Sequence, residues 1–230
     1  MVEASLYLSR AAGEVNVGEV MIELDYAALR SVGMGTDPFP HLVVPNFVPP
    51  AALRVVLADL PPLGRRGSIP PASLRLGPAA KALVQELEGP ALREAIADRF
   101  SLDLAGAPTM LTVRGWTNER DGHIHVDSTA KLVTVLLYLN PENGAFTSHE
   151  GCLRLLRGPR DLEDYGAEVP PVNGTLLVFP NGPNAWHGHK VFTGQRFSIQ
   201  LNYMTTDAKA RSELRRHRVS AFVKRLTRAA

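Results

Sequence analysis

The residues with the clearest capacity for chemistry are histidines and one aspartate, grouped in two short stretches. His123, His125 and Asp127 alternate with apolar residues in HIHVD, and His187 and His189 alternate in WHGH. Successive side chains of a β-strand point to opposite faces, so this alternation predicts that each group lies on one face of a strand. An imidazole and a carboxylate two residues apart on one face can chelate a single cation.

The set of donors indicates what kind of metal site this would be. Two histidines and one carboxylate on one face of an octahedron leave three adjacent positions open, as in non-haem Fe(II) oxygenases, which bind both a co-substrate and dioxygen. A closed structural zinc site would need four protein ligands, and Cys152 is the only cysteine in the chain. The pattern therefore favours an open, catalytic metal site.

The H-x-D pattern alone is weak, but its order relative to other elements is specific. H-x-D precedes a long β-rich run, KLVTVLLYLN. A second run, NGTLLVFP, precedes Trp186 and His187, and a turn at Thr193-Gly194 leads to Arg196. Together these elements resemble the Fe(II)/2-oxoglutarate-dependent dioxygenases, specifically the prolyl-4-hydroxylase-like branch. The resemblance covers about residues 107–205 closely and DPFPHLVVPNFVPP more loosely.

The resemblance implies a role for each member of the metal constellation. His125 and Asp127 match the first two ligands of the family, and these ligands are also its catalytic residues. The distal ligand of the family is a histidine nine residues before the arginine of a G-x-R turn, which here is His187 before Arg196. His189 is only seven residues before that arginine and is expected to be a neighbour. The roles of His123 and His189 stay open.

The resemblance also implies a co-substrate pocket around Arg196. Fe(II) with one carboxylate ligand carries a charge of +1, and a bound 2-oxoglutarate dianion makes the site −1, so the distal carboxylate needs a buried cation. An arginine fork binds such a carboxylate bidentately. Ser198 shares the strand face of Arg196 and can add a hydroxyl donor, and Tyr138 in YLN matches a tyrosine that this branch often adds.

The activity implied is hydroxylation of an unactivated C–H bond in a peptidyl-proline, an amino acid or another small molecule. Fe(II), 2-oxoglutarate and dioxygen are the implied cofactor and co-substrates, succinate and CO₂ the products, and ascorbate a reductant. Halogenating relatives carry a small residue in place of the aspartate, so Asp127 argues for hydroxylation. The resemblance does not select one of these substrate classes. Trp116, Arg120 and His189 are the candidate substrate contacts, and Arg114 is expected to border the mouth of the site.

Three other interpretations are weaker. A cupin-type metalloenzyme that does not use 2-oxoglutarate would add a glutamate a few residues after HIH, where this chain has none, and it would not explain Arg196. The branch that repairs alkylated nucleic acids carries a second arginine six residues after the first, where this chain has Asn202. A non-catalytic metal-binding jelly-roll protein would usually have lost a ligand, and none is missing here.

Composition and charge limit the partners. The chain has 230 residues, of which 45% are hydrophobic, and a net charge of +2. It shows no apolar run long enough to span a membrane and no secretory signal, and its single cysteine fits a reducing cytoplasm. Residues 207–230 carry eight basic and two acidic residues, so the rest of the chain is −4. Nucleic acid is therefore not an expected partner, and the sequence carries no signal for the oligomeric state.

The elements that must position these residues form a mainly β fold with flanking helices. Helical spacing predicts helices over about 25–31, from Pro49-Pro50 to Pro61, and over 79–100 with a break at Gly89-Pro90. After Ala107, seven or eight short β-rich runs separated by turn residues predict a sandwich or barrel. The resemblance specifies a double-stranded β-helix, that is, a cupin-like jelly roll with the N-terminal helices packed on its major sheet.

The expected organisation has three parts. Residues 1–36 form an N-terminal leader, and residues 37–206 form the dioxygenase domain, with helical support over 37–106 and a jelly-roll core over 107–206. Residues 207–230 form a basic C-terminal helix. Its apolar stripe is expected to pack on the domain while its charges stay in solvent; the stripe consists of Leu214, Ala221, Phe222 and Leu226.

Overall fold

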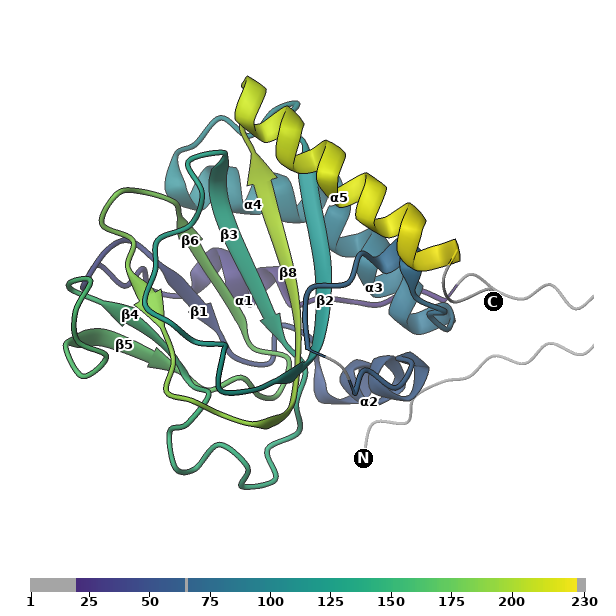
Figure 1. Cartoon of the computed structure of the whole chain (residues 1–230), viewed down its shortest axis with the longest axis horizontal. Coiled ribbons are helices and arrows are strands. Elements are labelled where there is room, and N and C mark those ends of the chain that lie inside the picture. The colour runs from purple at the N-terminus through teal and green to yellow at the C-terminus, as the bar shows by residue number, and fades with distance from the viewer. Residues whose placement is uncertain (1–19, 65, 227–230) are drawn as a thin grey trace, which may run out of the picture.

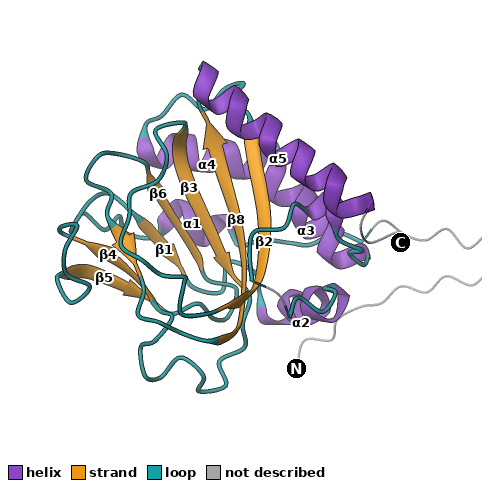
Figure 2. Ribbon diagram, in the orientation of Figure 1, coloured by secondary structure: helices purple, strands orange, loops and turns teal. Residues whose placement is uncertain are grey.

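The structure is a computed structural model that describes residues 20–64 and 66–226, with backbone alone over 220–226. Figure 1 shows its helices and strands, and Figure 2 distinguishes them by colour. The helices are α1 (Tyr26–Ser31), α2 (Pro50–Asp59), the short 3₁₀ helix η1 (Pro71–Ser73), α3 (Pro78–Glu88), α4 (Pro90–Phe100) and α5 (Ala208–Leu226). The strands are β1 (Leu42–Val44), β2 (Thr109–Thr117), β3 (Lys131–Tyr138), β4 (Leu153–Leu156), β5 (Tyr165–Val169), β6 (Leu176–Pro180), β7 (His187–Gly188) and β8 (Gly194–Met204).

The strands form two antiparallel sheets that face each other. The larger sheet has the order β1-β6-β3-β8-β2, and the smaller has the order β5-β4-β7. Buried residues of both sheets meet in one cluster, which includes Leu177 and Phe179 from the larger sheet and Leu153 and Val169 from the smaller. The predicted jelly-roll fold with flanking helices is confirmed.

The two faces of the larger sheet contact different parts of the molecule, because side chains alternate between the faces along each strand. On β3, Val133, Val135 and Leu137 belong to the main hydrophobic core, which lies between this sheet and helices α1, α3 and α4 (Figure 1). The residues between them, such as Thr134 and Tyr138, point to the other face, toward the smaller sheet. The helices thus cover one face, and the opposite face is left for the site.

Proline determines where the supporting helices begin. α2, α3 and α4 each start at a proline, whose missing N–H is one that a first helical turn leaves unpaired anyway. Pro90 directly follows Gly89, and this pair separates α3 from α4 as the sequence predicts. The helices bury Leu83 and Leu92 completely against the sheet.

A β-bulge in the pairing of β2 with β8 lies beside the site. The register shifts between Arg114 and Trp116, so that Arg114 pairs with Ser198 while Trp116 pairs with Gln195. Gly115 occupies the shift, and a Cβ atom there would lie 2.1 Å from Cβ of Leu63. Only glycine fits this position, because β2 passes against the loop that carries Leu63.

β5 is the strand that the sequence did not reveal. Its residues, YGAEV, follow a polar stretch and contain a glycine, and four of the five are half-buried or exposed. As an edge strand of the smaller sheet it buries only Val169 fully, so it lacks the apolar alternation that marks the central strands.

The C-terminal segment forms the predicted helix, and its first turns dock on the domain. Ala210 is fully buried beside Met204 and Ala130, and Leu214 packs against this cluster. Glu213 accepts a hydrogen bond from the Ser128 hydroxyl at 2.6 Å. The side chains of Ala221, Phe222 and Leu226 lie outside the described residues, so the predicted packing of that half of the stripe stays a prediction.

The predicted domain boundaries stay predictions as well. Residues 1–19 of the predicted leader lie outside the described residues. Its described part lies against the core, where Leu29 is fully buried. In the described part of the chain, none of the helices has the length and apolar character needed to cross a bilayer.

Truncation after Thr206 is expected to lower the melting temperature. The truncated chain exposes Met204, which α5 covers, and exposing one apolar side chain of this size costs about 2 kcal/mol. For a domain of this length that corresponds to a fall of about 4–8 °C in thermal unfolding. A truncation after Val219 keeps Ala210 and Leu214 and serves as the control. Equal melting temperatures for the two truncated chains would contradict the docking of this helix.

Candidate metal centre

The metal constellation is built from two chain segments that meet at the edge of the smaller sheet. His125 and Asp127 lie in the segment that leads into β3, and His187 begins β7. An isolated antiparallel bridge joins the segments: the His125 N–H donates to the His187 carbonyl at 3.0 Å, and the His187 N–H donates to the His125 carbonyl at 2.9 Å. These two hydrogen bonds fix the spacing of the two histidines.

The prediction that HIHVD forms a strand is wrong. Residues 123–127 contain only the bridge residue His125, and His189 lies just beyond the two residues of β7. The segment crosses from the end of β2 to the start of β3, so no neighbouring strand runs alongside its whole length. One bridge is enough to hold His125 against His187, and Asp127 follows two residues later at the start of the larger sheet.

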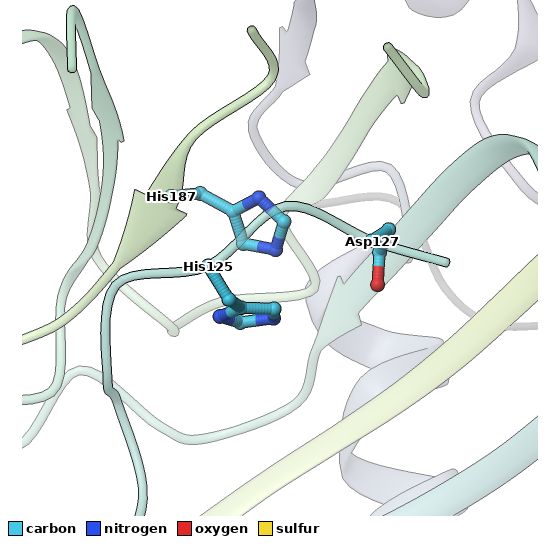
Figure 3. Close-up of side chains that lie close together, drawn as sticks. All are labelled: His125, Asp127 and His187. Carbon is cyan, nitrogen blue, oxygen red and sulfur yellow. The ribbon is translucent and has the colours of Figure 1, made fainter. Parts of the chain in front are cut away.

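The three predicted ligands converge. One ligand atom each from His125, Asp127 and His187 lies within 4.8 Å of the other two, and Figure 3 shows the two imidazole rings and the carboxylate close together. Among the described residues, this is the only such group of three. His187 is 4% exposed and the Asp127 side chain 7%, whereas His125 is exposed. The group is therefore buried on one side and accessible on the other.

Backbone carbonyls leave one nitrogen of each histidine free for a metal. Nδ1 of His125 lies 2.8 Å from the carbonyl oxygen of His123, and Nδ1 of His187 lies 2.9 Å from that of Ala185. A carbonyl oxygen can only accept, so in both rings Nδ1 carries the proton and donates it. In the neutral ring Nε2 is then the unprotonated nitrogen, which is the atom that binds a cation.

The Asp127 carboxylate is held from two sides. Lys131 Nζ lies 2.5 Å from Oδ1, and the Thr134 hydroxyl donates to Oδ2. Burial alone would raise the pKa of Asp127, but the charge and hydrogen bond of Lys131, together with His187 and Thr134, bring it below its ordinary value. Asp127 is therefore an anion at neutral pH, as a metal ligand must be. Sequence analysis did not identify Lys131 and Thr134, which follow Asp127 by four and seven residues.

His187 is neutral for a different reason. Burial lowers its pKa to about 4, and the neighbouring His125 acts in the same direction. A neutral imidazole at physiological pH keeps its Nε2 lone pair for coordination. The site thus combines two imidazole nitrogen donors with one anionic oxygen donor, the donor set that suits Fe(II).

A cavity of about 110 Å³ adjoins the metal constellation, and Arg196 lies within it. Arg196 is 6% exposed, and its Nε donates to the Gly151 carbonyl at 2.9 Å. Its guanidinium carbon lies 5.2 Å from the centre of the Tyr138 ring. Arg196 Nη2 and the Tyr138 hydroxyl are both buried, and neither has a hydrogen-bond partner among the described residues.

These unpaired donors fit a small dicarboxylate. A buried donor without an acceptor is costly, so a cavity that holds two of them calls for an anionic acceptor. Ser198 lines the same cavity and pairs with Tyr138 across β3 and β8. The cavity thus brings the three residues predicted to hold 2-oxoglutarate together with His125 and His187.

The remaining predicted residues are placed less centrally. His189 lines the cavity, with its Nδ1 bonded to the Lys190 carbonyl at 2.7 Å. His123 is exposed and contributes its backbone carbonyl to His125. Trp116, 37% exposed, and Arg120, also exposed, are not among the described residues that line the cavity. Their substrate role stays a prediction.

Replacing His189 by alanine is expected to change Fe(II) affinity by less than about threefold. Loss of a partner that hydrogen-bonds a ligand typically costs 10–100-fold in metal affinity, but the ring of His189 bonds the Lys190 carbonyl instead. Equilibrium metal binding, measured beside His187→Ala, checks this. A larger loss in the His189 variant than in the His187 variant would show that the two histidines have been assigned the wrong way round.

Comparisons with known proteins agree with this geometry. The family model of the 2OG-Fe(II) oxygenase superfamily matches residues 113–204. The fold is similar to that of a prolyl-4-hydroxylase from Pseudomonas putida, with a TM-score of 0.57, 20% identity, and coverage of 82% of this chain and 98% of that one. It is also similar to a Trichoplax adhaerens prolyl hydroxylase solved with a hypoxia inducible factor peptide fragment, with a TM-score of 0.52, 20% identity, and coverage of 82% and 90%. No curated protein sequence matches the chain.

Proposed function

Residues 113–204 belong to the 2OG-Fe(II) oxygenase superfamily, and from that membership we propose that the protein hydroxylates an unactivated C–H bond of a small-molecule or peptide substrate. The observation that carries the proposal is the convergence of His125, Asp127 and His187 beside a cavity that contains Arg196. A metal held there and a dicarboxylate held at the arginine would share one small space.

Fe(II) would be held by Nε2 of His125, Nε2 of His187 and the carboxylate of Asp127. When bound, it supplies with 2-oxoglutarate and dioxygen an oxidation that puts one oxygen atom into the substrate C–H bond and the other into succinate, with release of CO₂. The protein keeps His187 neutral by burial and Asp127 anionic through Lys131, so the donor set is ready before the metal arrives.

The chain's own residues bind and orient the co-substrate. Arg196 would pair its free Nη2 with the distal carboxylate of 2-oxoglutarate, and its Nε is already fixed by the Gly151 carbonyl. Tyr138 would donate its hydroxyl proton to the same carboxylate, and Ser198 is placed on the same row of the sheet. Such binding would provide an acceptor for two donors that are buried without a partner among the described residues.

The buried arginine makes the cupin-type alternative less suitable. A metalloenzyme that does not use 2-oxoglutarate has no need for a buried arginine with an unpaired nitrogen next to its metal ligands. Asp127 is also retained, which supports hydroxylation rather than halogenation. Ascorbate as a reductant and a cytoplasmic location remain parts of the proposal that follow from the family resemblance and the single cysteine.

The test is an assay of succinate release with Fe(II) and 2-oxoglutarate across panels of peptides, amino acids and saccharides. We expect succinate that depends on Fe(II) and dioxygen, and an increase with one class of substrate. The same assay with His125→Ala supplies the background. Succinate at the background level across all panels, with protein that binds iron, would contradict the proposed activity.

A further inference from the structure

A second arginine faces the cavity that contains Arg196. Arg114 of β2 lies opposite Ser198 of β8, and Tyr138 of β3 lies opposite Ser198 on the other side. Directly paired residues of antiparallel strands have their side chains on the same face. Tyr138, Ser198 and Arg114 therefore form one row across the larger sheet. Their strands β3, β8 and β2 are neighbours there (Figure 1). All three line the cavity, and the proposed co-substrate accounts for only the first two.

Among the described residues, none forms an ion pair with the guanidinium group of Arg114. Its Nε is buried and lacks a hydrogen-bond partner among the residues that the structure describes. Asp121 lines the same cavity, but its Oδ2 already accepts hydrogen bonds from Arg66 Nε at 2.8 Å and from the Asn118 N–H at 3.0 Å. Asp121 therefore forms its ion pair with Arg66, and it acts on Arg114 only through its charge.

The surroundings of Arg114 disfavour its positive charge. Burial lowers its pKa; Asp121 acts against this shift and the charge of Arg196 adds to it. Arginine still remains protonated in proteins, so two guanidinium groups face one small cavity and repel each other. An anion bound between them would relieve this repulsion, and the question is whether 2-oxoglutarate alone is enough.

The formal charges leave a positive surplus after 2-oxoglutarate has bound. In the structure the positive charge of Lys131 neutralises Asp127. A divalent metal and the 2-oxoglutarate dianion then cancel each other, and the charges of Arg114 and Arg196 remain without a counterion. If the metal displaces Lys131, then the metal, Asp127, 2-oxoglutarate and Arg196 sum to zero, and Arg114 still remains. A buried charge without a partner is costly, so the loaded site favours one more anionic group.

We propose, resting on the function proposed above, that Arg114 binds the carboxylate of the substrate and that the substrate is a small organic acid such as a free amino acid. The planar arginine fork binds a carboxylate through two parallel hydrogen bonds, which orients the molecule as well as holding it. A primary amide of the same shape carries no charge and only one acceptor oxygen.

Calorimetric binding to protein loaded with Mn(II) and saturating 2-oxoglutarate tests this, because Mn(II) permits binding to be measured without turnover. The ligands are the free L-amino acids and their primary amides. We expect at least one acid to bind wild-type protein roughly 30-fold more tightly than its amide, the size of effect typical of a desolvated ion pair. Arg114→Gln should remove this preference, and Arg114→Lys should keep part of it.

Two further measurements separate a substrate role from other roles. The 2-oxoglutarate affinity of Arg114→Gln should stay within about threefold of wild type, since Arg196 holds the co-substrate. Arg160→Gln removes the same charge from an exposed position that does not line the cavity and should change neither affinity. A purely structural role for Arg114 would instead lower the melting temperature and leave the preference for acids intact in Arg114→Lys and Arg114→Gln alike.

Three other outcomes would overturn the proposal for Arg114, and one of them would also overturn the proposed function. A panel in which no acid binds more tightly than its amide overturns the proposal for Arg114 while leaving the proposed function standing. Loss of 2-oxoglutarate affinity in Arg114→Gln as large as in an Arg196 variant also overturns it, because Arg114 would then belong to the co-substrate site. Failure of 2-oxoglutarate itself to bind the metal-loaded wild-type protein overturns the proposed function together with this inference.

Discussion

Replacing His125 by alanine is expected to abolish 2-oxoglutarate turnover and to lower Fe(II) affinity by more than about 100-fold. Losing a partner that merely hydrogen-bonds a ligand already costs 10–100-fold, and His125 would be a ligand itself. Asp127→Ala and His187→Ala should have effects of the same size. The measurements are equilibrium Fe(II) binding and succinate formation from 2-oxoglutarate.

His123→Ala is the matched control for this prediction. His123 is exposed and lies in the same segment, two residues earlier, and its backbone carbonyl continues to accept the hydrogen bond from His125 in the variant. It should bind Fe(II) as wild type does. Because the His125 side chain is exposed as well, the two metal-free variants should unfold at nearly the same temperature, which is typical of a catalytic rather than a structural metal site. Equal Fe(II) affinity in the two variants would remove His125 from the ligand set.

Replacing Arg196 by methionine is expected to weaken 2-oxoglutarate binding by about 2–5 kcal/mol, which is roughly 30-fold to several thousand-fold. The distal carboxylate would be buried without its cation, and most of the cost comes from that unpaired charge. Methionine keeps the apolar length of the side chain, so the change isolates the guanidinium group. Isothermal titration of Mn(II)-loaded protein with 2-oxoglutarate measures the effect.

Two further variants show whether the loss of 2-oxoglutarate affinity is specific to Arg196. Tyr138→Phe removes one neutral donor and should cost about 1 kcal/mol, or roughly fivefold. Arg160→Met removes a charge from an exposed position and should leave the affinity unchanged. If Tyr138→Phe weakens 2-oxoglutarate binding more than Arg196→Met does, then the arginine is not the anchor of the distal carboxylate.

The metal constellation could be predicted because its signal is local and ordered. H-x-D places two donors at fixed spacing. Arg196 follows His187 by nine positions, which ties the third donor to the co-substrate arginine through one short turn and the start of one strand. Three helices that begin at proline were equally clear. These features depend on residues close together in the chain, which is the range over which pattern and propensity are informative.

The features that were missed depend on contacts between distant segments. The alternation in HIHVD is typical of a strand. The segment nevertheless pairs with the rest of the described chain only through the bridge between His125 and His187, so it does not form a strand. Sequence analysis placed Arg114 only at the mouth of the site, and its position in the cavity beside Ser198 follows from the pairing of β2 with β8. Lys131 likewise gains its role only when β3 begins beside the Asp127 carboxylate.

A crystal structure of the protein with Mn(II) and 2-oxoglutarate gives the sharpest test of the proposed metal and co-substrate sites. We expect one metal ion bound directly by Nε2 of His125, Nε2 of His187 and a carboxylate oxygen of Asp127. The distal carboxylate of 2-oxoglutarate should lie within hydrogen-bond distance of Arg196. A metal bound through His189 in place of His187, or a 2-oxoglutarate whose distal carboxylate points away from Arg196, would contradict the proposed site.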